Sequence, residues 1–140
     1  MKKLLITIFI LLLTGCTKES VLECVKTEEL DNYKTISKEL ITFSNDNVLE
    51  YNASIEVVLD KDYIKYKSIF IKEIESNFKK YNKMNGVKFN SNETNNGINM
   101  TINADVSKMD DKSIKELKLA KKANIDITKQ EREKDGFKCK

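Results

Sequence analysis

The stretch LEYNASIEVVL, residues 49–59, decides the fold of this chain. Apolar side chains occupy the odd positions from Leu49 to Leu59, and polar side chains occupy the even positions from Glu50 to Glu56. A period of two is typical of a β-strand with one buried face. The stretch INMTINADV, residues 98–106, repeats the pattern with Ile, Met, Ala and Val against Asn, Thr and Asp. Both stretches predict half-buried strands of an antiparallel sheet.

Further strands are expected around these two. Residues 22–30 and 33–43 are rich in apolar and β-branched side chains, and the polar turn 44–47 joins the second of them to the next strand. A strand begins again at residues 87–89. Asn96-Gly97 follows, a dipeptide that favours a type I′ hairpin turn.

A long amphipathic helix is expected from Tyr63 to about Asn82, with Asp60 or Asp62 as its N-cap and Gly86 ending it in the left-handed conformation. Its apolar stripe recurs every three or four residues: Tyr63, Tyr66, Phe70, Ile74, Phe78 and Tyr81. Helical spacing alone explains the stripe as core. An aromatic ligand site is the alternative interpretation.

Two short helices are expected at the C-terminus. One covers residues 110–120. The other begins at the capping-box pattern of Thr128 and Glu131 and stops at Gly136. The predicted fold class is α+β, an antiparallel sheet of about five strands covered by one long amphipathic helix, with two short C-terminal helices.

The first of these short helices carries a set of lysines. Lys112, Lys115, Lys118 and Lys122 are three or four residues apart, so on a helix they would share a face. That face could contact anionic lipid head groups or anionic wall polymers. The alternative is an ordinary solvated helix face, in which Glu116 dilutes the positive charge.

The composition narrows the function classes. The 140 residues include 25 basic and 22 acidic side chains, three Cys and no His. Without His, no Ser-His or Cys-His catalytic set can form, and the commonest zinc ligand is missing. The pairs Asp60–Asp62 and Asp110–Asp111 stand where helices are expected to begin, so capping explains them. We expect one domain with no catalytic, cofactor or metal site.

The N-terminus has the pattern of an export signal. Two lysines precede the apolar residues 4–13, a stretch shorter than the roughly 20 residues of a membrane span. The ending Leu13-Thr14-Gly15-Cys16 resembles the lipobox of bacterial lipoproteins. That resemblance implies cleavage before Cys16 and a diacylglyceryl group on its thiol, enough for stable anchoring. An uncleaved anchor, or an ordinary signal peptide with a stray Cys, is the alternative.

The lipobox divides the chain into a signal peptide (1–15), a short lipidated tether (16–23) and a single domain (24–140). Its location would be the extracytoplasmic face of a membrane. Cleavage removes Lys2 and Lys3, so 23 of the 25 basic residues remain against 22 acidic ones. A nearly neutral exported chain is a poor candidate for nucleic-acid binding.

Cys24 and Cys139 remain once Cys16 carries lipid, and they stand near the two ends of the domain. Outside the cytoplasm two such residues most simply form one disulfide. Neither belongs to a CxxC motif, so a redox-active pair is not expected.

The layout also resembles the YehR-like group of small bacterial lipoproteins in its lipobox, the Cys shortly after it, the central helix and the ending Gly136-Phe137-Lys138-Cys139-Lys140. That resemblance implies a fold and a location, without an activity. We expect a non-catalytic binding or scaffolding domain anchored to the envelope, whose Asn- and Thr-rich sheet face is either simply solvated or binds sugars or peptides. An accessory subunit of a membrane complex is the alternative, and a carboxylate-based hydrolase a weaker one.

Overall fold

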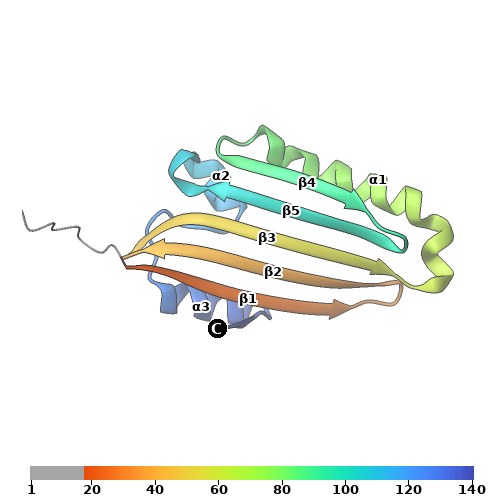
Figure 1. Ribbon diagram of the computed structural model, residues 1–140, viewed down its shortest axis with the longest axis horizontal. Coiled ribbons are helices and arrows are strands. Elements are labelled where there is room, and N and C mark those ends of the chain that lie inside the picture. Colours follow the sequence, from red (N-terminus) through yellow and green to blue (C-terminus); the bar gives the residue numbers. More distant parts are fainter. Residues whose placement is uncertain (1–17) are drawn as a thin grey trace, which may run out of the picture.

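The computed structural model describes residues 18–140. They form an α+β fold in which six antiparallel strands make one sheet, in the order β4-β5-β3-β2-β1-β6 (Figure 1). The strands are β1 (Glu19–Glu29), β2 (Tyr33–Ser44), β3 (Asn47–Leu59), β4 (Val87–Glu93), β5 (Gly97–Asp105) and β6 (Lys138–Cys139). The α+β class and the antiparallel sheet are confirmed. The expected count of about five strands omitted β6, which pairs with β1 over only two residues.

The helical segments lie along one face of the sheet. Figure 1 shows α2 and α3 behind the strands and α1 running beside β4, while the front face stays bare. The α-helices are α1 (Lys67–Phe78), α2 (Asp111–Glu116) and α3 (Ile125–Lys134), and the 3₁₀ helices are η1 (Lys61–Tyr66), η2 (Lys79–Lys83) and η3 (Val106–Lys108). Within residues 18–140, no helix combines the length and the apolar character needed to cross a bilayer.

The alternation in β5 is confirmed residue by residue. Ile98, Met100, Ile102 and Ala104 are buried, whereas Asn99, Thr101 and Asn103 are exposed. In β3 the expected pattern needs one correction, because Leu49 is only half-buried and Val48 takes the buried position. The β2–β3 register shifts between Thr42 and Phe43, and this bulge moves one residue of β3 out of phase.

The expected helix over residues 63–82 is present as one helical segment, but only its middle part is α-helical. A 3₁₀ turn, α1 and a second 3₁₀ turn follow one another from Lys61 to Lys83. The apolar stripe reaches the core only in its second part, where Phe70, Ile74 and Phe78 pack against the sheet. Four apolar side chains at its start are exposed, namely Tyr63, Ile64, Tyr66 and Ile69. Figure 1 shows this start beyond the end of β3, so no strand lies beneath it.

Gly86 and Gly97 require glycine for different reasons. Gly86 has a φ of +77°, the left-handed conformation expected after the helix. The type I′ turn expected at Asn96-Gly97 is wrong, because neither residue is among those with a positive φ. Gly97 faces β3 so closely that a Cβ would lie 1.8 Å from the carbonyl oxygen of Val57. Close strand contact, and not turn geometry, requires glycine there.

The C-terminal helices differ from the prediction at two of their ends, because α2 stops earlier and α3 starts earlier than expected. The second begins at Ile125 because Asn124 Oδ1 accepts the backbone N–H groups of Asp126 (2.8 Å) and Ile127 (3.4 Å). Thr128 therefore lies inside α3 and does not cap it. Gly136 ends α3 with a φ of +91°, as expected.

Candidate functional site

The chain enters the sheet very close to Cys16, which itself lies outside the described residues. β1 begins at Glu19, so residues 19–23 of the expected tether are part of the sheet and pair with β2. Only residues 17 and 18 separate Cys16 from this strand. Three Cα–Cα steps of about 3.8 Å span at most about 11 Å. Any anchor on Cys16 would thus hold this end of the sheet near the anchoring surface.

The disulfide between Cys24 and Cys139 is confirmed. Its sulfur atoms are 2.01 Å apart, and the two residues are paired neighbours on β1 and β6. Two backbone hydrogen bonds between Glu23 and Lys140 extend this pairing to the last residue. The bond joins positions 115 residues apart, so it ties both ends of the domain into the same sheet edge.

The four lysines expected on one helix face do not lie on one helix, which corrects that prediction. α2 ends at Glu116 because Lys118 adopts a φ of +52° and terminates the helix. Lys112 and Lys115 lie within α2, Lys118 follows it, and Lys122 forms a β-bridge with Asn47. Contact of these lysines with an anionic surface stays a prediction, but it can no longer be based on a shared helix face.

Neighbouring carboxylates also reduce the positive charge around these lysines. Lys118 pairs with Asp135 at 3.3 Å, and the adjacent Lys121 pairs with Asp111 at 3.3 Å. Exposed pairs of this kind contribute little to stability, but they offset the charge of the lysines that take part in them.

The carboxylate pairs at the helix starts have different roles. Asp110 Oδ1 accepts the Ser113 backbone N–H at 2.7 Å, and this hydrogen bond holds the pKa of Asp110 below its ordinary value of 3.8. Capping therefore accounts for Asp110. Asp60 occupies the N-cap position of η1 but makes no capping hydrogen bond through its side chain, so that expectation is wrong.

The bare face of the sheet is the first candidate binding surface. Across β3 and β5 the polar side chains are placed opposite one another, as Asn52 and Asn103 and as Ser54 and Thr101. Shallow hollows of about 150 and 360 Å³ lie over these pairs and extend to β2. On the β3–β5 side these hollows are lined mainly by amides and hydroxyls, whereas β2 adds the charged Lys38 and the apolar Ile36 and Leu40. Amides and hydroxyls both donate and accept hydrogen bonds.

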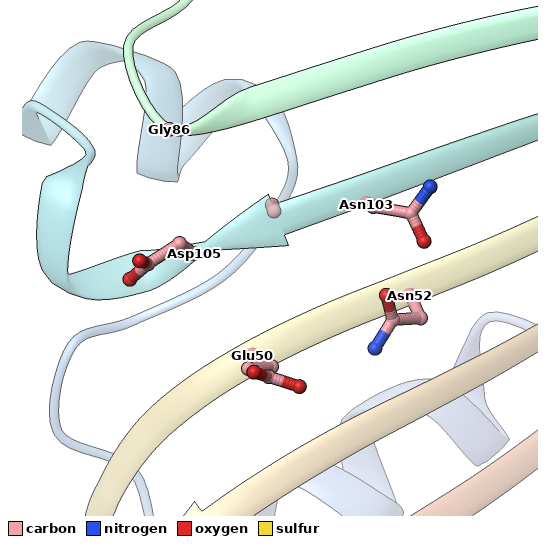
Figure 2. Close-up of a pocket in the computed structure, with 6 residues that line it drawn as sticks. Glu50, Asn52, Gly86, Asn103 and Asp105 are labelled. Atoms are coloured by element: carbon pink, nitrogen blue, oxygen red, sulfur yellow. The ribbon is translucent and has the colours of Figure 1, made fainter.

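A third hollow, of about 250 Å³, lies at the end of this face nearest the start of β1. Figure 2 shows Glu50 and Asn52 extending from β3 and Asn103 and Asp105 from the neighbouring strand, with Gly86 at the rim. Asp105 accepts hydrogen bonds from Lys108 at 2.7 Å and from Ser107, which hold the pKa of its carboxyl below the ordinary value. Its charge is thus already matched within the chain.

A buried ionic cluster on the opposite face was not predicted. Glu39 of β2 and Arg132 of α3 lie 2.9 Å apart, and Tyr51 of β3 donates its hydroxyl to Glu39 Oε1 at 2.9 Å. The exposed fractions are 8% for Glu39 and 6% for Arg132. Burial is the main cause that raises the pKa of Tyr51, and the nearby Glu39 carboxylate raises it further.

A sequence signal for this cluster did exist. Within β2, Glu39 alternates in phase with Ile41 and Phe43, so it is a charged residue at a position that faces the buried side of the strand. Arg132 is the single arginine among 25 basic residues. Arginine is the cation best suited to a buried ion pair, so a lone arginine and an inward-facing acid were natural partners.

Comparison with known proteins adds one distant structural similarity. No family model matches the sequence, and no curated protein matches it. A solved structure described as the NMR structure of the protein from Streptococcus pneumoniae TIGR4 is similar over 72% of this chain and 67% of that one. The identity is 13% and the TM-score is 0.48.

Proposed function

We propose that this protein is a bacterial envelope lipoprotein, anchored through diacylglyceryl-Cys16, whose domain is a non-catalytic binding module on the extracytoplasmic face of a membrane. The observation that carries the binding role is the bare sheet face, on which amides and hydroxyls of β3 and β5 lie opposite one another as Asn52–Asn103 and Ser54–Thr101. A ligand rich in hydroxyl or amide groups, such as a wall sugar or peptide, matches that chemistry.

The disulfide supports the proposed location. Such bonds persist in oxidising compartments and are rare in the cytoplasm. Cys24 is fully buried, so this bond is part of the folded core and is not an accidental surface link. The short distance between Cys16 and β1 supports a domain held directly against the membrane.

Anchoring is tested by mass spectrometry and cell fractionation. The native product is expected to begin at Cys16, to carry the mass of a diacylglyceryl group and to sediment with membranes. Cys16→Ser is expected to abolish the lipid, whereas the neighbouring Thr17→Ser keeps the lipobox and serves as the matched control. An intact leader, or an unmodified thiol at Cys16 in the native product, would contradict the anchor.

Binding by the sheet face is tested with purified peptidoglycan fragments as the probe. Thr101→Lys places a long charged side chain at the centre of the face and is expected to weaken co-sedimentation with the fragments. Ser76→Lys, at an exposed hydroxyl residue of α1, is the matched control and is expected to leave it unchanged. Equal binding by both variants would contradict a role for this face.

The alternative role, an accessory subunit of a membrane complex, has one observation in its favour. Tyr63, Ile64, Tyr66 and Ile69 form an exposed apolar cluster, and clusters of this kind mark contact sites on many proteins. The cluster lies at the opposite end of the sheet from Glu19, where β1 begins, about 35 Å along the 11 residues of β1. Crosslinking in intact cells would yield a stoichiometric partner, lost in Ile69→Ser, only under this alternative.

A further inference from the structure

The apolar cluster of Tyr63, Ile64, Tyr66 and Ile69 stands where η1 passes into α1. Tyr66 is 52% exposed and Ile69 is 70% exposed, although both are large apolar side chains. The rings of Tyr63 and Tyr66 have centroids 6.4 Å apart, because residues three apart in a 3₁₀ helix lie in line. Ile69 follows three residues later. A row of apolar side chains is therefore exposed at this end of the sheet.

The fold gives the cluster no place in the core. The same segment packs against the core through other side chains, namely Phe70, Ile74 and Phe78. Phe70 meets Tyr33 of β2 with ring centroids 5.1 Å apart, so the contact between helix and sheet is already made without the cluster. Exposed apolar clusters of this kind mark surfaces that another molecule covers.

The side chains around the cluster have the chemistry of a lipid interface. Lys65 and Lys72 stand on either side of Ile69 along the segment, and neither makes an ion pair within residues 18–140. Lys65 Nζ lies 5.0 Å from the centroid of the Tyr66 ring. A tyrosine has an apolar body and a polar tip, and a lysine can extend its ammonium group from an apolar surface into water. Both residue types suit the boundary between acyl chains and head groups.

The net charge of this segment is small. Residues 60–73 contain four lysines and three acidic residues, and one of the lysines, Lys67, pairs with Glu93 at 2.7 Å. Attraction to anionic lipid is therefore weak. Contact with a bilayer would depend on the apolar side chains, since the binding of interfacial helices grows with the apolar area that they bury.

The proposed anchor keeps a bilayer within reach of the cluster. At most about 11 Å of chain separates Cys16 from Glu19, where β1 begins. The cluster lies at the other end of this strand, about 35 Å away. A domain that lies lengthwise on the bilayer brings both ends to the lipid. Because a tether raises the effective concentration of the surface, even a weak contact would be occupied.

The bare face of the sheet is less suited to lipid. Its outward-facing strand positions hold six carboxylates, the first being Glu19 and the last Asp105, but only three lysines, the first being Lys34 and the last Lys88. This excess of negative charge disfavours contact with anionic head groups. A domain held by the apolar cluster would leave the bare face open to a ligand.

From these observations we propose that the apolar cluster binds the head-group region of the bilayer that carries the anchor. Tyr63, Ile64, Tyr66 and Ile69 enter the boundary between head groups and acyl chains, while Lys65 extends its ammonium group toward water. The inference rests on the proposed lipid anchoring and deepens it, because a second contact sets how the domain lies on the membrane.

The test is NMR of the mature lipidated protein in phosphatidylcholine nanodiscs that contain spin-labelled lipid. We expect loss of the amide signals of residues 63–69, which the nearby spin label broadens. Residues 45–47 should also lose signal, because the start of β1 pairs beside them with the end of β2. Asn99, on the bare face at the same end of the sheet as the cluster, is expected to keep its signal.

Variants of the cluster separate its contact from the anchor. Tyr66→Ser combined with Ile69→Ser is expected to restore the signals of residues 63–69 and to leave the loss at residues 45–47. Ile127→Ser, at an isoleucine of α3 that is 57% exposed, is the matched control and is expected to keep the native pattern. Ile69→Ser alone replaces the double variant if that variant does not give a folded spectrum.

The possible outcomes distinguish this inference from the proposed anchoring. Signal loss at residues 45–47 without loss at residues 63–69 would overturn the inference while the anchor stands, and absence of loss at both would overturn both. Loss at residues 63–69 alone would support the lipid contact and contradict the anchor. Loss at residues 63–69 only after phosphatidylglycerol is added would assign the contact to lysines and overturn the role of the apolar cluster.

A protein partner is the competing occupant of the cluster. A crosslinked partner that is lost in Ile69→Ser, together with unchanged signals of residues 63–69 in the nanodiscs, would assign the cluster to the accessory-subunit role and overturn the lipid contact.

Discussion

Arg132 Nε lies 2.9 Å from Glu39 Oε2, and these two residues join α3 to the centre of the sheet. The contact brings the single arginine of the chain to an acid on β2, 93 residues earlier in the sequence (132 − 39). Because both side chains are buried, each charge depends on the other for compensation. The pair therefore fixes the position of α3 over β2 and β3.

Removal of one partner is expected to be far more damaging than removal of both. Arg132→Met leaves the Glu39 carboxylate buried without its cation, which costs about 3–5 kcal/mol in cases of this kind. The double variant Glu39→Met with Arg132→Met removes both charges and should lose less. Urea unfolding followed by circular dichroism measures both free energies of unfolding. The coupling would be contradicted if the loss of stability in the double variant equalled the sum of the losses in Arg132→Met and Glu39→Met.

The disulfide is expected to stabilise the domain strongly. It closes a loop of 116 residues, from 24 to 139 inclusive. The chain-entropy model assigns such a loop about 4–5 kcal/mol, which is an upper value because strain and residual unfolded structure reduce it. The double variant Cys24→Ala with Cys139→Ala should show this loss in chemical denaturation. In parallel, thiol alkylation of the folded, unreduced native protein should modify neither cysteine.

Gly97 should not tolerate even a methyl group. A Cβ there would lie 1.8 Å from the Val57 carbonyl oxygen, so β3 and β5 would have to separate. We expect Gly97→Ala to lower the free energy of unfolding by at least about 2 kcal/mol, in the range of other overpacked sites. Asn96→Ala, at the exposed neighbouring position, should change it by less than about 0.5 kcal/mol. A thermal melt of both variants gives the comparison.

Lys118 is expected to be a site where glycine stabilises the protein. Its φ of +52° is unfavourable for a residue with a Cβ, while glycine adopts it freely. The N–H groups of Lys118 and Leu119 bond back to Lys115 and Ile114, the pattern of a glycine-terminated helix. Lys118→Gly should raise the free energy of unfolding by about 0.5–1 kcal/mol.

The helix interior supplies the control for this substitution. Lys115→Gly places glycine within α2 and should lower the free energy of unfolding by about 0.5–1 kcal/mol. Chemical denaturation of the two variants should therefore give shifts of opposite sign. Shifts of the same sign would show that the conformation at Lys118 does not limit stability.

Asp110 should contribute to the acid sensitivity of the fold. The hydrogen bond from Ser113 lowers the pKa of its carboxyl in the folded state, so the folded protein binds this proton less readily than the unfolded chain. The contribution is present above the unfolded value near 3.8 and is lost as the pH falls through the lower folded value. The stability difference between the native protein and Asp110→Asn should shrink below about pH 4. Urea midpoints measured from neutral to acid pH provide the test.

The antiparallel sheet could be predicted without the structure, because alternation in β3 and β5 is a local property that needs no knowledge of the partner strand. The disulfide was predictable for a similar reason, since only two cysteines remained once Cys16 was assigned to lipid. The extent of α2 was not, because helical spacing among the lysines cannot reveal that Lys118 turns left-handed. The exposed start of the aromatic stripe was missed because its spacing does not show where the underlying sheet ends.

What the sequence determined by itself is the class of the fold, the cysteine pairing and the amide- and hydroxyl-rich character of β5, all of which follow from residue type and periodicity. Only the tertiary structure decided which polar residues meet inside. Glu39 and Arg132 lie on separate elements far apart along the chain, and their contact depends on how α3 crosses the sheet. Gly97 likewise needed the position of β3, because the close approach that demands glycine is made by another strand and not by the turn that precedes it.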